Sequence, residues 1–129
     1  MARAAVVKSI SRDIGVLKSM LGYMYKMNSC LKKRYCLNLE SFSKREDCRD
    51  TCSFYLTQIY ALGNKLSDES KNSISFIKDN SITPIRNLII NNYSGLQISV
   101  LYAIVLSCSS QTALSEVKDR LKLCKSLLS

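Results

Sequence analysis

The sequence of 129 residues contains no histidine, only one proline and only four glycines. Histidine is the commonest general base and a frequent zinc ligand, so its absence removes Ser–His and Cys–His nucleophile pairs and most kinds of zinc site. Scarce proline and glycine leave few breakers of regular structure, which favours a chain dominated by helices. These absences predict an all-α protein that is not an enzyme and needs no cofactor.

A long hydrophobic run is also missing. The most apolar stretch, Ser94–Cys108, has only Ser99 and Tyr102 as polar breaks between Ile98 and Leu106. It is shorter than the run of about 20 apolar residues that a membrane-spanning helix needs. Apolar side chains that face almost every direction are typical of a helix surrounded by other helices. We therefore expect Ser94–Cys108 to form a buried central helix.

Neither end of the chain carries a targeting or anchoring pattern. Met1–Ile10 contains Arg3 and Lys8 and has no apolar run of the kind that a signal peptide requires. The sequence stops at Ser129 without a hydrophobic tail. We expect one domain over residues 1–129, with no C-terminal membrane anchor.

The chain is strongly basic, because 19 basic residues against 10 acidic residues give a net charge of +9. The excess is spread over several blocks instead of being gathered in one, so a nucleic-acid groove is not indicated. A basic, solvated surface is the preferred interpretation, and a basic helical nucleic-acid binder is an alternative class.

The six cysteines are Cys30, Cys36, Cys48, Cys52, Cys108 and Cys124. An even number in a small chain raises the question of disulfides, but the lack of a signal peptide favours free thiols in a reducing compartment. The first four are separated by steps of six, twelve and four residues, which do not match the paired knuckles of zinc sites. We therefore expect no metal site. Cys108 and Cys124 lie on apolar helix faces and are expected to act as small buried hydrophobes.

Apolar residues at helical spacing divide the chain into about six or seven helices. The first is expected over Ala5–Met27 and is followed by a loop over Ser29–Ser43. A capping box of Ser43 and Glu46 then starts a second helix, which ends near Leu66. Ser67 and Asp68 are expected to start a third helix. Ser81 or Thr83 is expected to start a fourth helix, with Pro84 in its first turn. The central helix follows the polar corner Asn91–Gly95, and a last amphipathic helix starts at Thr112.

The second helix carries four apolar residues with a glycine directly after the third. They are Tyr55, Ile59, Leu62 and Leu66, and the glycine is Gly63. A small residue there lets another helix approach closely. The pattern resembles the third homology motif of the B-cell lymphoma two (Bcl) family of apoptosis regulators, in which Gly-Asp stands between the third and fourth apolar positions. Here Asn64 stands in place of the aspartate, which keeps the shape and loses the charge.

The corner ahead of the central helix is the second point of resemblance. In the Bcl family this corner reads Asn-Trp-Gly-Arg and opens into the buried central helix. Only Gly95 is retained here, because Ser94 replaces the tryptophan and Leu96 replaces the arginine. The order of parts also agrees: amphipathic helix, basic loop, motif helix, short helix, corner and apolar helix. With its short length and no tail, the chain is most similar to the homologues encoded by DNA viruses, those of iridoviruses among them.

The resemblance implies a Bcl-like helical bundle around the buried central helix, with a groove on its surface. Pro-survival members hold the amphipathic death-motif (BH3-type) helix of host pro-death proteins in that groove and so inhibit mitochondrial apoptosis. It further implies a location in the host cytoplasm, access to the mitochondrial outer membrane through partners, neither a membrane span nor nucleic-acid binding, and a homodimer as an optional assembly. The groove residues expected from the resemblance are Tyr55, Ile59, Leu62, Phe76, Ile77, Ile85, Arg86, Leu88, Ile89, Gly95, Leu96 and Val100.

The missing corner arginine has a consequence for ligand choice. In the family it pairs with an aspartate of the ligand, and the expected substitutes here are Arg86 or the amides of Asn91 and Asn92. We expect a narrow range of ligands, because a buried aspartate left unpaired is penalised. Two alternatives stay open at this stage: a pro-death member of the same family, which shares fold and motifs, and a secreted, disulfide-stabilised helical ligand or lipid binder.

Overall fold

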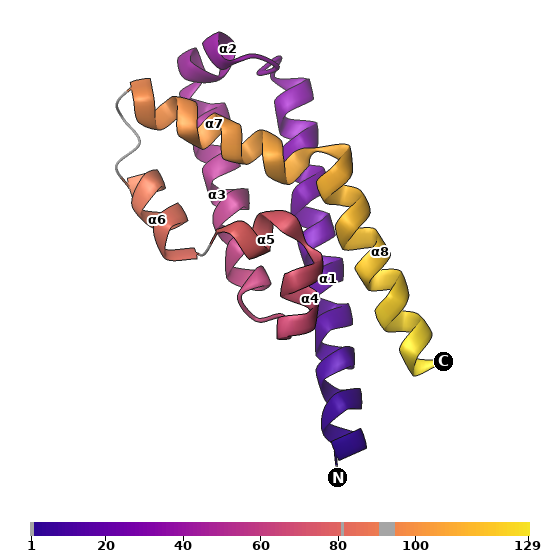
Figure 1. Cartoon of the computed structure of the whole chain (residues 1–129). Helices are drawn as coiled ribbons and strands as arrows, with labels where there is room; N and C mark the ends of the chain where they lie inside the picture. The colour runs from indigo at the N-terminus through magenta and orange to yellow at the C-terminus, as the bar shows by residue number, and fades with distance from the viewer. Residues whose placement is uncertain (1, 81, 91–94) are drawn as a thin grey trace.

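Most of the chain that the structure describes is helical. The computed structural model describes residues 2–80, 82–90 and 95–129, and within them it contains eight α-helices and no strand (Figure 1). The helices are α1 (Ala2–Lys33), α2 (Leu39–Lys44), α3 (Glu46–Gly63), α4 (Asp68–Ser73), α5 (Ser75–Asp79), α6 (Ile82–Ile90), α7 (Gly95–Ser109) and α8 (Gln111–Leu128). The expectation of an all-α chain is confirmed, with more helices than expected because the predicted third helix is divided in two and a short helix, α2, forms largely within the predicted loop.

Helix α1 is the axis of the molecule. It packs along α3 and along α8, and both neighbours run in the opposite direction to it (Figure 1). Its side chains Leu17, Met20, Met24 and Met27 recur at steps of three and four, and all four are 0% exposed. Burying a side chain of this size contributes roughly 1.5–3 kcal/mol to stability. The long middle of α1 is therefore the centre of the hydrophobic core.

The sequence predicts that α7 is the buried centre of the bundle. This prediction is wrong, because α7 is not buried on all sides. Leu101, Val105 and Cys108 are buried, but Val100 and Leu106 are each 43% exposed. Since α1 already takes the place between α3 and α8, α7 lies across the bundle and only one of its faces is covered (Figure 1). Among the described residues no single helix is long and apolar enough to cross a membrane; residues 97–109 and 111–128 pass such a test only as a pair, and they are bent by 45°.

The region between the first two predicted helices is more regular than expected. Helix α1 continues to Lys33, and α2 follows after a short turn, so the predicted loop over Ser29–Ser43 is wrong. The predicted capping box is also wrong, because Ser43 lies inside α2 and does not cap α3. The cap of α2 is Asn38, whose side chain accepts a hydrogen bond from the Ser41 amide at 2.8 Å. Helix α3 then starts after Arg45, which provides no side-chain cap.

The later helix starts are a mixed result. Ser67 caps α4 as predicted, and its hydroxyl accepts from the Ser70 amide at 3.3 Å. The predicted third helix is split into α4 and α5 by an extended residue, Ile74. Pro84 lies in the first turn of α6 as predicted, while Thr83 lies inside that helix and Ser81 falls outside the described residues. Ser110 caps α8 in place of the predicted Thr112.

A left-handed residue ends α1. Tyr35 has a φ of 56°, and the amides of Tyr35 and Cys36 donate back to the carbonyls of Lys32 at 3.3 Å and Leu31 at 2.9 Å. This pair of bonds is the Schellman motif, which satisfies the last carbonyls of a helix and usually has glycine at the left-handed position. The reversal turns the chain back over the end of α1 and buries Cys36, which is 0% exposed.

One buried carboxylate joins three helices. Asp13 on α1 is 1% exposed and accepts hydrogen bonds from the Ser67 amide at 3.0 Å, the Ser67 hydroxyl at 2.5 Å and the Ser70 hydroxyl at 2.6 Å. Arg120 on α8 in turn donates to the Ser70 hydroxyl at 2.9 Å. Buried polar groups need such partners, since an unsatisfied one costs about 1–3 kcal/mol. Asp13 therefore fixes the start of α4 against α1 and α8.

Replacing the left-handed tyrosine by glycine should stabilise the protein. A side chain in this conformation costs about 1–2 kcal/mol, and the greater backbone entropy of unfolded glycine offsets part of the gain. We expect Tyr35→Gly to raise the free energy of unfolding by about 0.5–1 kcal/mol, measured by urea denaturation. The ring is 79% exposed, so little packing is lost. Tyr35→Ala keeps a Cβ and should give no gain; an equal gain would show that the backbone conformation is not the cause.

Removing the Asp13 carboxylate should destabilise the protein strongly. Asp13→Ala leaves two hydroxyls and one amide without their acceptor, and we expect a loss of about 2–3 kcal/mol in the free energy of unfolding. Asp119→Ala removes an exposed carboxylate and is the matched control, with an expected change within about 0.5 kcal/mol. Equal losses in the two variants would contradict a structural role for Asp13.

Candidate functional site

The predicted apolar residues of the motif helix α3 differ in how deeply they are buried. Ile59 is 0% exposed and belongs to the core, while Leu62 is half-buried. Tyr55 is also half-buried, and its ring lies 6.0 Å from that of Tyr23 on α1 and 5.8 Å from that of Phe54. Tyr55 therefore packs toward α1, on a different side of α3 from the short helices that follow.

The predicted groove residues of α5 and α6 are distributed between core and surface. Phe76, Ile77 and Ile85 are 4%, 7% and 1% exposed and pack in the core. Leu88 and Ile89 are half-buried against it, and Arg86 is exposed.

On α7, Val100 is exposed to 43%. The backbone of Gly95 and Leu96 starts this helix, but their side chains lie outside the described residues, as does the corner over residues 91–94.

A pocket opens where α3, α5 and α6 meet. It has a volume of about 470 Å³. Its lining residues are Tyr60, Asn64, Lys71, Ile77, Lys78, Asp79, Asn80, Ile82 and Pro84. Of the residues predicted for the groove only Ile77 is among them. The remaining lining residues could not be found from the sequence alone. The pocket depends on how α5, which Ile74 separates from α4, lies against α3.

Tyr60 holds the wall of this pocket in place. Its hydroxyl donates to the Phe76 carbonyl at 3.0 Å, and the Cys108 thiol donates to that hydroxyl at 3.7 Å. Burial is the main reason that the pKa of Tyr60 is raised above its usual value, so the ring keeps its proton and remains a donor. The α5 backbone is thereby tied to α3 at the edge of the pocket.

Gly63 permits the close approach at the end of α3. A Cβ placed on Gly63 would lie 2.5 Å from Cδ1 of Ile77 and 3.2 Å from its Cγ1. The prediction that a small residue here lets another helix approach is confirmed. Gly63 is the last residue of α3 and is buried, so the approach occurs at the helix end and not along its middle.

The pocket combines an apolar floor with a basic rim. Ile77, Ile82 and Pro84 supply the apolar part, and the charged lining residues are Lys71, Lys78 and Asp79. The lysines place a net positive charge beside an apolar surface. This arrangement suits an apolar side chain with a carboxylate near it.

Comparisons of the chain with protein-family models, with curated proteins and with solved structures give no match.

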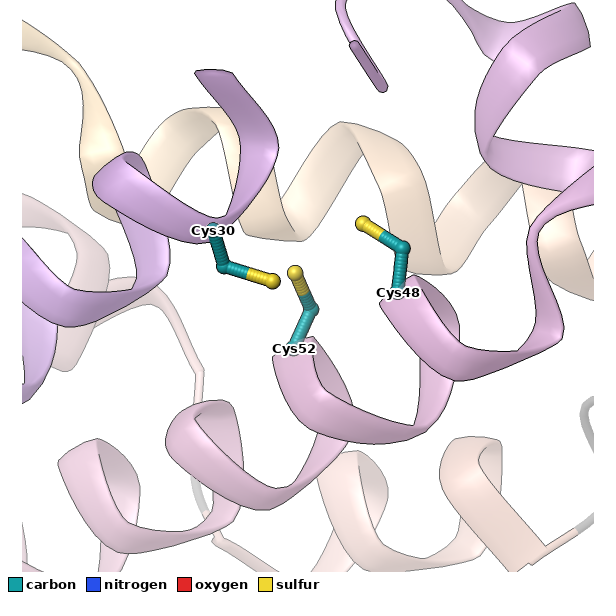
Figure 2. A group of neighbouring side chains, drawn as sticks. All are labelled: Cys30, Cys48 and Cys52. Carbon is teal, nitrogen blue, oxygen red and sulfur yellow. The ribbon is translucent and has the colours of Figure 1, made fainter. Parts of the chain in front are cut away.

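The six cysteines are all free and buried, so the structure holds no bridge of the kind that a disulfide-stabilised protein would use. Cys108 and Cys124 are 0% exposed, as expected of small buried hydrophobes. The unexpected feature is that Cys30, Cys48 and Cys52 converge at the α1–α3 interface (Figure 2). Burial raises the pKa of the Cys52 thiol to about 12 and also raises that of Cys48, so both thiols are protonated at neutral pH when nothing is bound.

The contact between Gly63 and Ile77 can be measured with a double-mutant cycle. Gly63→Ala adds a methyl group that collides with Cδ1 of Ile77, which costs about 1–3 kcal/mol and outweighs the roughly 1 kcal/mol gained in helix propensity. Ile77→Val removes Cδ1 and relieves the collision. We therefore expect Gly63→Ala to destabilise the native chain by about 1 kcal/mol more than it destabilises the Ile77→Val variant, measured by urea denaturation. Equal effects in the two backgrounds would show that the two residues are not in contact.

Proposed function

We propose that this chain is an inhibitor of mitochondrial apoptosis that binds the death-motif (BH3-type) helix of pro-death Bcl-family proteins, as the viral members of that family do. The observation that supports the proposal best is the pocket at the C-terminal end of the motif helix, between α3, α5 and α6. In the Bcl family the ligand helix is held by the motif helix and the helices that follow it. The pocket lies among the corresponding elements of this chain.

The apolar floor of the pocket suits an anchor residue of an amphipathic helix. In helix-in-groove recognition, apolar side chains on one face of the ligand enter apolar pockets of the receptor. Ile77, Ile82 and Pro84 offer that surface, and a few such anchors carry most of the affinity. Half-buried Leu88 and Ile89 on α6 provide further apolar surface on the helix that forms one wall.

The lysines at the rim suit the acidic residue of a death-motif helix. Lys71 and Lys78 both line the pocket, whereas Arg86, one of the substitutes expected from the sequence, is exposed on α6 and does not. The other expected substitutes, Asn91 and Asn92, lie outside the described residues. Attraction between a basic rim and an acidic ligand raises the association rate and favours the correct orientation. We therefore assign the role of the missing family arginine to Lys78, with Lys71 beside it.

Titration of a panel of fluorescent death-motif peptides against the purified protein tests this function. We expect only part of the panel to bind, because lysine cannot form the bidentate pair with a carboxylate that the family's arginine forms, and ligands that depend on that pair are penalised. Lys78→Glu should weaken binding roughly tenfold, and Ile82→Ala should weaken it by a similar factor. Lys18→Glu, an exposed charge reversal on α1, is the matched control and should leave the affinity unchanged.

Two outcomes would count against the proposal. Binding to no peptide of the panel would refute the function. Binding that is insensitive to both pocket variants would place the ligand elsewhere on the protein. Circular dichroism of each variant separates a lost contact from a lost fold.

A further inference from the structure

Four cysteines from three separate segments meet at one end of the α1–α3 interface. Cys30 lies near the end of α1, Cys36 follows the Schellman turn, and Cys48 and Cys52 lie in the first turns of α3. The Sγ atoms of Cys30, Cys48 and Cys52 all lie within 4.8 Å of one another, and Figure 2 shows the three side chains pointing into the same space. All four residues are buried, with Cys30 at 8% exposure and the others at 0%.

Local structure explains how the thiols come together. Cys48 and Cys52 are four residues apart, so they lie one above the other on the face of α3 that packs against α1. The reversal at Tyr35 brings Cys36 back over the end of α1. The Cys36 thiol then lies 3.6 Å from the Arg34 carbonyl and close enough to interact with the thiol of Cys48. Spacing along the chain could not show this, because the convergence depends on the α1–α3 packing and on the turn.

The arrangement is close to that of a thiolate metal site. A tetrahedral zinc ion with Zn–S bonds of about 2.3 Å requires its sulfurs to lie about 3.8 Å apart. Sulfurs that already lie within 4.8 Å of one another need to move by only about 1 Å to reach this geometry. Four sulfur ligands without a carboxylate or carbonyl oxygen among them select zinc and other soft cations over magnesium and calcium.

Two arginines lie near the cysteine cluster. Arg34 lies close enough to Cys30 and Cys48, and Arg45 close enough to Cys36 and Cys48, for their guanidinium groups to interact with thiolates there. Both arginines contact Asp47, so two positive charges are paired with a single carboxylate. Both arginine side chains are exposed, so solvent screens the remaining positive charge and its effect on a thiolate cluster is small.

We propose that Cys30, Cys48 and Cys52, with Cys36 as the fourth ligand, bind one zinc ion that fastens the end of α1 to the start of α3. Each ligand thiol releases its proton to solvent as its Zn–S bond forms, and no electron is transferred. Four protein ligands leave no open position for a substrate, so the ion is structural and not catalytic. The site is independent of the peptide-binding pocket, which lies at the opposite end of α3.

Titration of the reduced, metal-free full chain with Co²⁺, followed by competition with Zn²⁺, tests the site. We expect one equivalent of Co²⁺ to give the sulfur-to-metal charge-transfer band and the intense visible absorption of tetrahedral thiolate coordination. Cys52→Ser should weaken binding at least about 100-fold. Cys124→Ser alters an equally buried cysteine outside the cluster and should bind as the native chain does.

Two results would overturn the proposal. They are no metal binding by the reduced native chain, and equal binding by Cys52→Ser and the native chain. In the first case the four cysteines are core packing only. Binding that is unchanged in Cys36→Ser would overturn the assignment of that residue as the fourth ligand.

A second measurement on the native chain avoids reliance on variants that fail to fold. Zn²⁺ should slow the alkylation of Cys30, Cys48 and Cys52 in mild denaturant by at least tenfold, read for each residue by mass spectrometry. Cys108 and Cys124 are internal references and should be slowed much less, since only the cluster is tied directly to the ion. Equal protection of all five cysteines would indicate general stabilisation without ligation, and no protection would indicate no binding; either result contradicts the site.

Discussion

The packing of α3 and α8 against α1 is the interaction on which the rest of the structure depends. The buried middle of α1 is rich in methionine, with Met20, Met24 and Met27 all at 0% exposure. Methionine is unbranched and fills irregular space, so one helix can be packed by two neighbours of different sequence. The remaining helices are arranged around this antiparallel trio: α2 turns the chain from α1 into α3, and α4 to α7 lead from α3 to α8 (Figure 1).

Both candidate sites are consequences of how α3 lies on α1. Its 18 residues span about 27 Å, with Cys48 in its first turn and Gly63 at its last position. At the first end, the turn after α1 brings further cysteines against it. At the other end, the contact of Gly63 with Ile77 draws α5 in and leaves the pocket between α5 and α6. A metal ion at the first end would therefore fix the helix that forms one wall of the pocket, although the ion and the peptide would not touch.

Local features of the fold could be predicted from the sequence, and features that depend on distant residues could not. The helical class, the cap at Ser67 and proline in the first turn of α6 each depend on residues near in sequence. The close approach at Gly63 could be predicted because glycine alone indicates it, although its partner Ile77 could not. The structural role of Asp13 was not predicted, because its carboxylate accepts hydrogen bonds from Ser67 and Ser70, which lie 54 and 57 residues further along the chain. The pocket and the cysteine cluster were missed for the same reason.

The apolar helix α7 shows how composition can mislead about position. Its sequence is apolar on nearly every side, and such a helix is expected to be surrounded. A helix needs several neighbours to be covered completely, and in a chain of this size the neighbours α3 and α8 already pack on α1. Val100 and Leu106 are left exposed as a result. The central position that the sequence predicts for α7 is held by α1. The proposed binding function therefore rests on the pocket formed by α3, α5 and α6, and a ligand helix seated there would owe its specificity to Ile77, Ile82 and Lys78 more than to α7.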